Sequence, residues 1–430
     1  MRTWWWKWRQ ISRRLWVRTT LIGFLGIATA LLAAVVESWI PWQVPAFVKV
    51  DAIESLLTII ASSMLAVTTF SLGIMTSAYG SASNGVTPRA TKLLMEDSLT
   101  QTVLASFIGS FIFSIVGMIV LRFGAYGERG RVVLFVVTIG VIALIVINLL
   151  RWIDYLTRFG RSGETIDRVE AATQAALSQR LAQPFLGANL WSEPARIPDT
   201  AQSVRAAKVG VVQHIDMPAL QEAAQALNAR IFIEAVPGKQ LFMDSALAWL
   251  AYEDGRSTPP DDAPAWLEKV HSAFVIATSR DFEQDPRFGM AVMCEIASRA
   301  LSPATNDAGT ALDIIARSTR LLSFWAVEQA QQATPHEEVQ YPSLYVPALQ
   351  SADLFDDAFT LMARDGAGLI EVQLSLQKSL AALSRLGNAD FQQAAREQAA
   401  LALARAENAL TLEQDKQRLR ALVVGLYPPS

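Results

Sequence analysis

Four apolar stretches of membrane-spanning length in the first 160 residues constrain this chain more than any other feature of its sequence. They cover about residues 17–40, 56–79, 102–121 and 132–153, and no charged side chain lies in their central parts. A helix needs about 20 apolar residues to cross the hydrocarbon core of a bilayer. Nothing here alternates apolar and polar residues as a membrane β-strand would. The sequence therefore predicts an α-helical integral membrane protein with four transmembrane helices.

The rest of the chain differs in composition. Hydrophobic residues make up 52% of the sequence, but they are concentrated in the transmembrane domain expected over residues 1–160. We expect an amphipathic helix and linker over 161–200, a small α/β or β-rich domain over 201–280, and a mostly helical cytoplasmic domain over 281–430 that ends in a helical bundle. The net charge of −3 gives no support for nucleic-acid binding. The single cysteine excludes internal disulfides and multi-cysteine metal sites.

Basic residues at the ends of the spans predict the orientation. Cytoplasmic loops carry an excess of Lys and Arg. Basic residues without acidic neighbours precede the first span, and further arginines follow the fourth: Arg2, Lys7, Arg9, Arg13, Arg14 and Arg18, then Arg151, Arg158, Arg161 and Arg168. The arginines of the turn at 122–131 are the one contrary signal. We therefore expect a multi-pass protein of the bacterial inner membrane with both termini in the cytoplasm, and we favour this over cleavage of the first span as a signal peptide.

The second span is rich in hydroxyl-bearing and small residues. Six of them recur at helical spacing on one face: Thr58, Ser62, Thr69, Gly73, Thr76 and Gly80. One interpretation is a water-filled path, because oxygen atoms can replace part of the hydration shell of an ion. The other is close helix packing, which small residues permit, and packing is the favoured one. No ionisable residue lies in the span cores, so a proton relay is disfavoured.

The most distinctive soluble segment lies between residues 280 and 310. Its residues of interest are Arg280, Gln284, Asp285, Pro286, Phe288, Gly289, Arg299, Ser302, Pro303, Asn306 and Asp307. Asp285-Pro286 and Ser302-Pro303 each look like a helix start, with a capping side chain followed by proline, and Asn306 or Asp307 can cap the next helix. Capping is favoured over a carboxylate metal site or catalysis. It predicts that Asp285→Ala costs about 1 kcal/mol and that asparagine or serine, which also cap, partly restore the stability.

This segment resembles a known family. The runs from Arg280 to Gly289 and from Arg299 to Asp307 are similar to the signature of bacterial predicted membrane proteins catalogued as domain of unknown function 2254. The resemblance extends to the Trp- and Arg-rich N-terminus, to Thr87-Pro88-Arg89 and to Gly210…Ile215-Asp216. Where the family pattern has Asn-Asp-Pro-x-Thr, this chain has alanine at position 308. The resemblance implies an inner-membrane protein and supplies no activity or ligand.

Shorter patterns predict the elements of the soluble part. Strands are expected over Val209–Ile215, Arg230–Ala235, Gln240–Phe242 and Ala246–Ala251, and a helix capped by Asp216 follows the first of them. Helices are expected over 88–95, 163–180, 351–364, 369–386, 391–410 and 412–424, the last with a capping box at Thr411…Gln414.

The function is the least constrained property. The sequence contains no nucleophile elbow, zinc-protease motif, phosphate loop or dinucleotide fingerprint, and Cys294 lies among apolar neighbours. We expect no enzyme activity, cofactor or metal. The leading hypothesis is a passive ion or solute channel-like protein controlled by its cytoplasmic domain, and the alternative is a membrane-anchored sensor or scaffold without transport. The expected partners are the lipid bilayer and further copies of the chain, and not nucleic acid.

Overall fold

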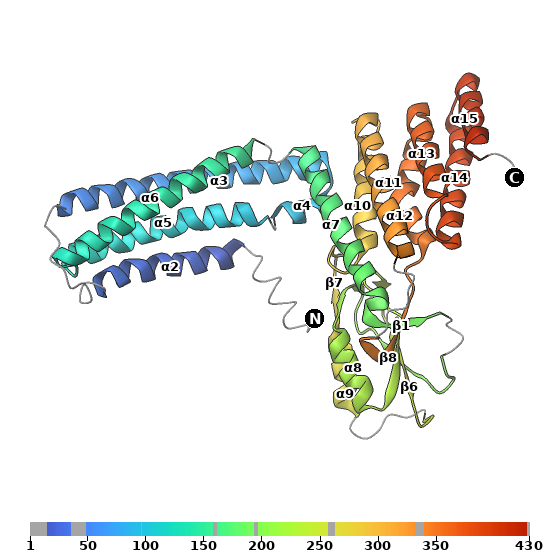
Figure 1. Ribbon diagram of the computed structural model, residues 1–430, viewed down its shortest axis with the longest axis horizontal. Helices are drawn as coiled ribbons and strands as arrows, with labels where there is room; N and C mark the ends of the chain where they lie inside the picture. Colours follow the sequence, from blue (N-terminus) through green and yellow to red (C-terminus); the bar gives the residue numbers. More distant parts are fainter. Residues whose placement is uncertain are drawn as a thin grey trace. The chain divides into compact units, whose positions relative to one another are not determined.

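The computed structural model describes residues 15–35, 49–95, 97–157, 161–192, 197–256, 263–331 and 339–427 (Figure 1). The chain divides into two compact units, a membrane unit over Lys7–Thr165 and a second unit that contains Ile166–Ser430. The N-terminal tryptophans from Trp4 to Trp8 lie outside the described residues. Each unit is treated separately below.

The membrane unit contains five described helices: α2 (Leu15–Val35), α3 (Val50–Gly85), α4 (Pro88–Met95), α5 (Ser98–Arg122) and α6 (Glu128–Leu156). Three of them, α3, α5 and α6, are long and apolar enough to cross a membrane. The apolar part of α2, Trp16–Leu32, is shorter, and the expected first span continues into residues that are not described. Three of the four expected spans are therefore supported, and the first stays a prediction.

Helix α5 is the centre of this unit, packing against α2, α3 and α6. Glycine permits the contact with α2, because a Cβ on Gly109 would lie 2.6 Å from Ile22 Cγ2. The small residues of α5 therefore seat against α2 as well as α3. Polar groups are paired across the bundle: Asn148 Nδ2 donates to Ser106 Oγ (3.0 Å) and Trp152 Nε1 donates to Ser71 Oγ (2.9 Å).

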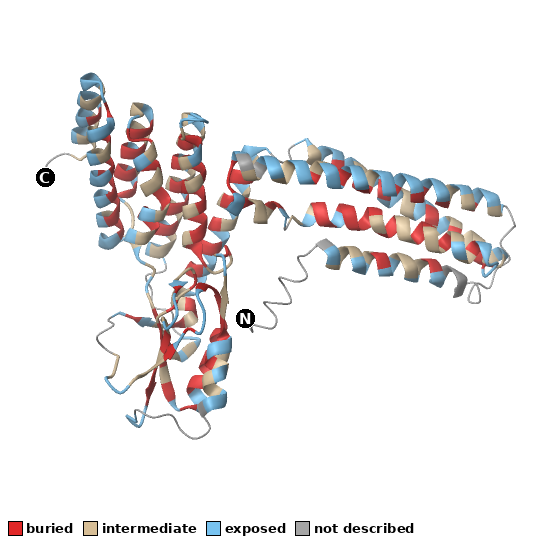
Figure 2. Cartoon of the chain, turned by 180° about the vertical axis from the view of Figure 1, so that it is seen from behind, coloured by how far each residue is buried: buried red, intermediate tan, exposed pale blue. Residues whose placement is uncertain are grey.

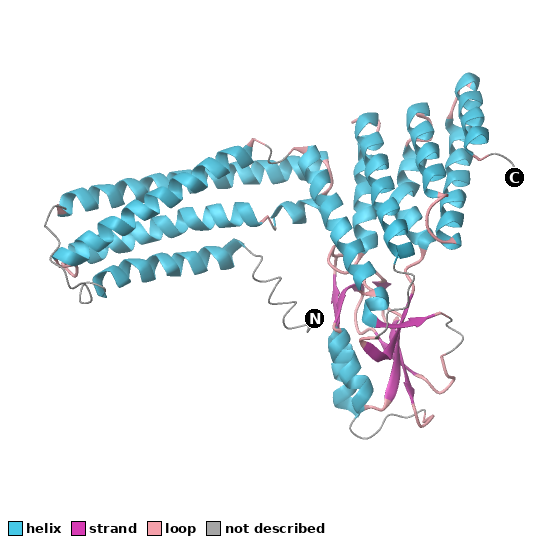
Figure 3. Ribbon diagram, in the orientation of Figure 1, coloured by secondary structure: helices cyan, strands magenta, loops and turns pink. Residues whose placement is uncertain are grey.

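The second unit begins with α7 (Ser162–Ala182) and a short 3-10 turn, and then builds two sheets (Figure 3). The elements of the sheet region are β1 (Ala188–Trp191), β2 (Gln202–Arg205), β3 (Gly210–Ile215), α8 (Met217–Ala226), β4 (Ala229–Ile233), β5 (Gln240–Leu241), β6 (Ala246–Tyr252), α9 (Ala263–Ala273), β7 (Phe274–Ala277) and β8 (Tyr341–Pro347). The larger sheet has the order β1-β8-β4-β6-β2, and the smaller has the order β5-β3-β7.

Strand β8 joins the larger sheet from far along the chain. It pairs in parallel with β1 and with β4, while β4 pairs antiparallel with β6. The sheets and α8 share one apolar core, in which Val212, Leu220, Ile231, Leu250 and Val346 are buried. Strands β3 to β6 and the Asp216 cap of α8, whose carboxylate accepts from the Ala219 amide, confirm the sequence predictions.

Helices form the remainder of the second unit: α10 (Pro286–Ala300), α11 (Ala308–Gln331), α12 (Ser351–Asp365), α13 (Ile370–Leu383), α14 (Ala389–Ala409) and α15 (Glu413–Leu426). They pack as neighbours, α10 against α11 and α12, α12 against α14, and α13 against α11, α14 and α15. In Figure 2 the buried residues lie on the faces that the helices turn toward one another.

Two capping predictions were wrong. Ser302-Pro303 does not start a helix, because residues 301–305 form turns after α10, in which the Ser302 carbonyl accepts from the amides of Thr305 and Asn306. The expected capping box of α15 is also absent, since the N-cap residue is Leu412, which makes no side-chain capping bond.

Candidate functional sites

The hydroxyl face of α3 is exposed on the membrane unit. All six of its residues, Thr58, Ser62, Thr69, Gly73, Thr76 and Gly80, are exposed. The opposite side of α3 makes the contacts with the bundle, and its buried residues include Ile53, Leu57, Ile60, Met64 and Met75. Thr58 still reaches α5, with its Oγ1 3.3 Å from Met118 Sδ. Close helix packing and a water path both stay predictions for this face.

The hydroxyl groups on this face satisfy themselves locally. The Oγ atoms of Thr58, Ser62, Thr69 and Thr76 each donate to the carbonyl four residues earlier, at 2.8 to 2.9 Å. Such a bond satisfies the hydroxyl donor within its own helix, and the hydroxyl oxygen can still accept another hydrogen bond or bind an ion. A Cβ on Gly73 or Gly80 would meet no atom within 4 Å. The face thus offers oxygen atoms and small side chains to whatever lies beside it.

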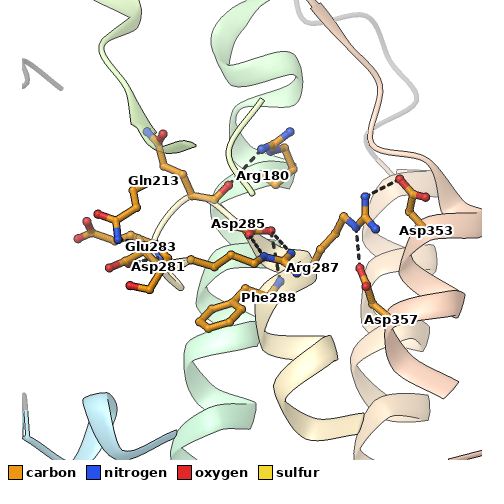
Figure 4. A network of polar contacts seen from close by, with 12 residues as sticks. Arg180, Gln213, Asp281, Glu283, Asp285, Arg287, Phe288, Asp353 and Asp357 are labelled. Atoms are coloured by element: carbon orange, nitrogen blue, oxygen red, sulfur yellow. Dashed lines mark hydrogen bonds and ion pairs between the residues drawn. The ribbon is translucent and has the colours of Figure 1, made fainter. Parts of the chain in front are cut away.

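The second site is the beginning of α10, where the Asp285 carboxylate accepts three hydrogen bonds (Figure 4). Its carboxylate caps the helix by accepting from the Phe288 amide at 3.2 Å. It also accepts two bonds from the Arg280 guanidinium, Nε to Oδ2 at 2.7 Å and Nη2 to Oδ1 at 3.0 Å. Asp285 is 2% exposed. The predicted cap is confirmed, but Asp285 is also the acidic partner of a buried bidentate ion pair, and that pair needs the charge.

Two glycines bring other segments close to α10. Gly238 lies in the turn between β4 and β5 with φ of +91°, and a Cβ there would meet Asp285 Oδ2 at 2.4 Å. Gly289 faces α7, and a Cβ there would lie 1.9 Å from Thr173 Oγ1. Glycine is therefore required at both positions, at Gly238 for its backbone conformation and at Gly289 for the close approach of two helices.

The neighbouring signature residues connect α10 to the sheets and to α7. Gln284 Oε1 accepts from the Ile215 amide at 3.1 Å, and its carbonyl accepts from Arg180 Nη2 at 3.2 Å. Arg180, from α7, is 9% exposed. Burial lowers the pKa of Arg180 to about 10, and the charge of Asp285 opposes that shift. Phe288 packs against Phe282 and under Arg280, whose guanidinium carbon lies 5.2 Å from the ring centroid.

Arg287 connects α10 to α12. Its Nε donates to Asp357 Oδ2 and its Nη1 donates to Asp353 Oδ2, both at 2.6 Å. Burial alone would lower the pKa of Arg287, but the hydrogen bond and charge of Asp357, with the charge of Asp353, hold that pKa above its ordinary value. Arg287 thus holds the starts of two helices together.

The other half of the signature lies at the opposite end of α10. Arg299 is exposed there, in the last turn. Asp307 caps α11, since its Oδ1 accepts from the Thr310 amide at 3.0 Å. Asn306 precedes it with φ of +50°. The structure therefore separates the eleven signature residues into two clusters, and no metal-binding group of three His, Cys, Asp or Glu occurs among the described residues.

Sequence reasoning missed several residues of the first cluster. Arg180 lies in α7, Gly238 in the turn between β4 and β5, and Asp353 and Asp357 in α12, and no local pattern marks these residues. Cys294 is fully buried, and burial raises its pKa to about 12, as expected of an inert core thiol.

Comparisons with known proteins identify the family of the chain. The uncharacterized proteins Rv1290c of Mycobacterium tuberculosis and Mb1321c of Mycobacterium bovis are each 27% identical to the chain over 240 residues, which is 54% of the chain and 45% of the relative. The chain thus spans about half the length of these relatives. No solved structure matches it. A family model described as "Predicted membrane protein (DUF2254)" matches residues 12–382, so the chain belongs to the DUF2254 family of predicted membrane proteins.

Proposed function

We propose that several copies of this chain form a passive pathway for an ion or a small solute, lined by the hydroxyl face of α3 and controlled by the second unit. The observation that carries the proposal is the exposure of that face. Hydroxyl-bearing and small residues of membrane helices are enriched where helices meet, and hydroxyl oxygens can line a water path. Further copies arranged around α3 supply such an environment.

The flanks of the face support assembly. Large apolar side chains border the stripe, with Ile59 60% exposed and Phe70 67% exposed. Apolar flanks suit contact with lipid or with a neighbouring helix, while the glycines between them permit close approach. The absence of ionisable side chains in the span cores favours passive movement over proton coupling.

The orientation belongs to the same proposal. The basic residues at the span ends support an orientation with both termini in the cytoplasm of a bacterium and the protein in its inner membrane. The second unit is then cytoplasmic, where it can bind a ligand that controls the pathway. A reporter fused after Ser430 should be active only as a cytoplasmic reporter, and periplasmic activity there would contradict the orientation.

Flux into liposomes tests conduction. Thr69→Val removes one hydroxyl from the exposed face, and Thr68→Val removes one from the buried side of the same helix, where Thr68 Oγ1 donates to the Met64 carbonyl. We expect the first variant to alter ion flux or selectivity and the second to leave it unchanged. Equal flux in both variants and the parent would reject a conducting face.

A second candidate is a membrane-anchored scaffold in which the same face only joins copies of the chain. The bonding of each hydroxyl to its own helix favours it, because these groups need no water. This candidate predicts stable oligomers without flux, and it predicts that Gly73→Leu breaks the oligomer while Thr69→Val is tolerated.

A further inference from the structure

A cavity lies beside the Asp285 ion pair, entirely within the second unit. Its volume is about 230 Å³, below the range of pockets that hold drug-sized ligands but several times the space that one water occupies. The walls come from α7, the β4–β5 turn, the start of α10 and the segment that leads from β8 into α12. Such a space fits a small ion or one group of a larger molecule.

Cations outnumber carboxylates on the cavity wall. Arg180, Lys239, Arg280 and Arg287 line it, against Asp285 and Asp353. Both carboxylates are already bound by guanidinium groups, Asp285 by Arg280 and Asp353 by Arg287. Lys239 pairs with Glu234, which does not line the cavity. Arg287 also pairs with Asp357. Among the described residues, Arg180 is therefore the one cation of the wall that forms no salt bridge.

Arg180 is the least compensated of these cations. Among the described residues it makes one hydrogen bond, from Nη2 to the Gln284 carbonyl, and it lines the cavity. The nearest carboxylate, Asp285, is already used twice by Arg280. Burial of a guanidinium is costly unless the charge is paired, so a bound anion would supply the missing partner.

The side chains on the wall favour one class of anion. Arg180 and Lys239 both line the cavity. An arginine fork and a lysine together match the several oxygens of a phosphate better than the two of a carboxylate.

We propose that this cavity binds a phosphate group, either free or as the ester of a small molecule, through Arg180 and Lys239. Binding there does not require that α3 conducts. Because the anion would join α7 to the turn between β4 and β5, its binding stabilises the contact between these two segments.

Calorimetric titration of the full-length protein in detergent tests the site, with inorganic phosphate, glycerol phosphate and acetate as probes. We expect saturable binding of at least one phosphate probe, weaker binding of acetate, and at least about a tenfold loss of affinity in Lys239→Gln, since one charge-assisted bond is removed. Arg180→Gln should abolish binding. Binding of inorganic phosphate identifies the free ion as sufficient, and binding of glycerol phosphate alone identifies an ester.

Arg420→Gln is the matched control, because Arg420 pairs with Glu407 at an exposed site far along the chain. It should bind phosphate as the parent does. If Arg180→Gln fails to fold, Lys239→Gln still decides the matter, since Lys239 is part-exposed. Absence of saturable phosphate binding in the parent, or equal affinity in the parent, Lys239→Gln and Arg420→Gln, would overturn the proposal.

Discussion

Gly289 in α10 and Gly73 in α3 show two opposite uses of small residues in one chain. A Cβ on Gly289 would lie 1.9 Å from Thr173 Oγ1, whereas a Cβ on Gly73 would meet nothing within 4 Å. Gly289 is buried against α7. Around Gly73 the described part of the chain places no atom within 4 Å of an added Cβ, although the surrounding hydroxyls follow a regular helical face.

The two regions differ in the contacts that the chain itself supplies. The first cluster of the signature, around Asp285 and Arg280, is stabilised from within, by a cap, a bidentate pair and close helix contact. The six residues of the α3 face are exposed among the described residues, and the proposed function supplies a neighbour from outside the chain. Substitutions in the signature should therefore change the free energy of unfolding, and substitutions on the α3 face should change assembly or flux.

The largest effect is expected from Gly289→Ala. The added methyl group collides with Thr173, so α7 and α10 must move apart, and we expect a loss of about 3 kcal/mol or more in the free energy of unfolding. Thermal unfolding in detergent measures it. Gly73→Ala is the control and should cause no loss. Removal of the Thr173 side-chain oxygen, as Thr173→Ala, should restore part of the stability of Gly289→Ala; an unperturbed Gly289→Ala single variant would contradict the close contact.

Asp285→Asn should come next, with a loss of about 2–3 kcal/mol. Asparagine keeps the cap but leaves the Arg280 guanidinium, and with it Arg180, without a counter-charge. Denaturant unfolding of Asp285→Asn, Asp285→Ala and the double variant Arg280→Met/Asp285→Asn measures the contribution of charge. We expect Asp285→Asn to be only slightly more stable than Asp285→Ala. The double variant should lose less free energy of unfolding than Asp285→Asn does. Full rescue by asparagine would return Asp285 to a simple cap, as the sequence alone predicts.

The smallest effect is expected from Asp307→Ala, at about 1 kcal/mol, because an exposed cap is lost. Asp307→Asn should retain most of that stability. The hydrogen bond from the Thr310 side chain, with further amide bonds, lowers the pKa of Asp307 below 3.8. A lowered pKa in the folded state means that this stabilisation is present above about pH 4 and is lost as the pH falls through the folded value. Parent and Asp307→Ala should therefore converge in stability in acid; a constant gap would contradict this.

Local signals in the sequence predicted the local structure well. The boundaries of β3, α4 and α8 and the caps at Asp216, Asp285 and Asp307 follow from side chains within a few residues. The span helices follow from length and apolar composition alone. The predicted helix caps at Ser302-Pro303 and at Thr411 were wrong. Both sites lie just after the end of a helix, and local propensity does not decide where that preceding helix ends.

Long-range pairing was not predictable in the same way. Strand β8 reaches the larger sheet from beyond α11, and Arg180 meets the α10 start from more than 100 residues away. Nothing near either segment in the sequence signals its partner. The same limit applies to α3: periodicity identified the face, but only the packing of α5 on the other side showed that the chain leaves it uncovered.

Cysteine labelling with a membrane-impermeant thiol reagent tests the α3 face most directly. Single cysteines at 69, 73 and 76 lie on the hydroxyl face, and cysteines at 70 and 72 replace its exposed apolar neighbours. The parent chain is a clean background, because its single cysteine, Cys294, is fully buried. In intact membranes we expect labelling at 69, 73 and 76 and protection at 70 and 72. Protection of all five positions, or equal labelling of all five, would contradict a water path along α3.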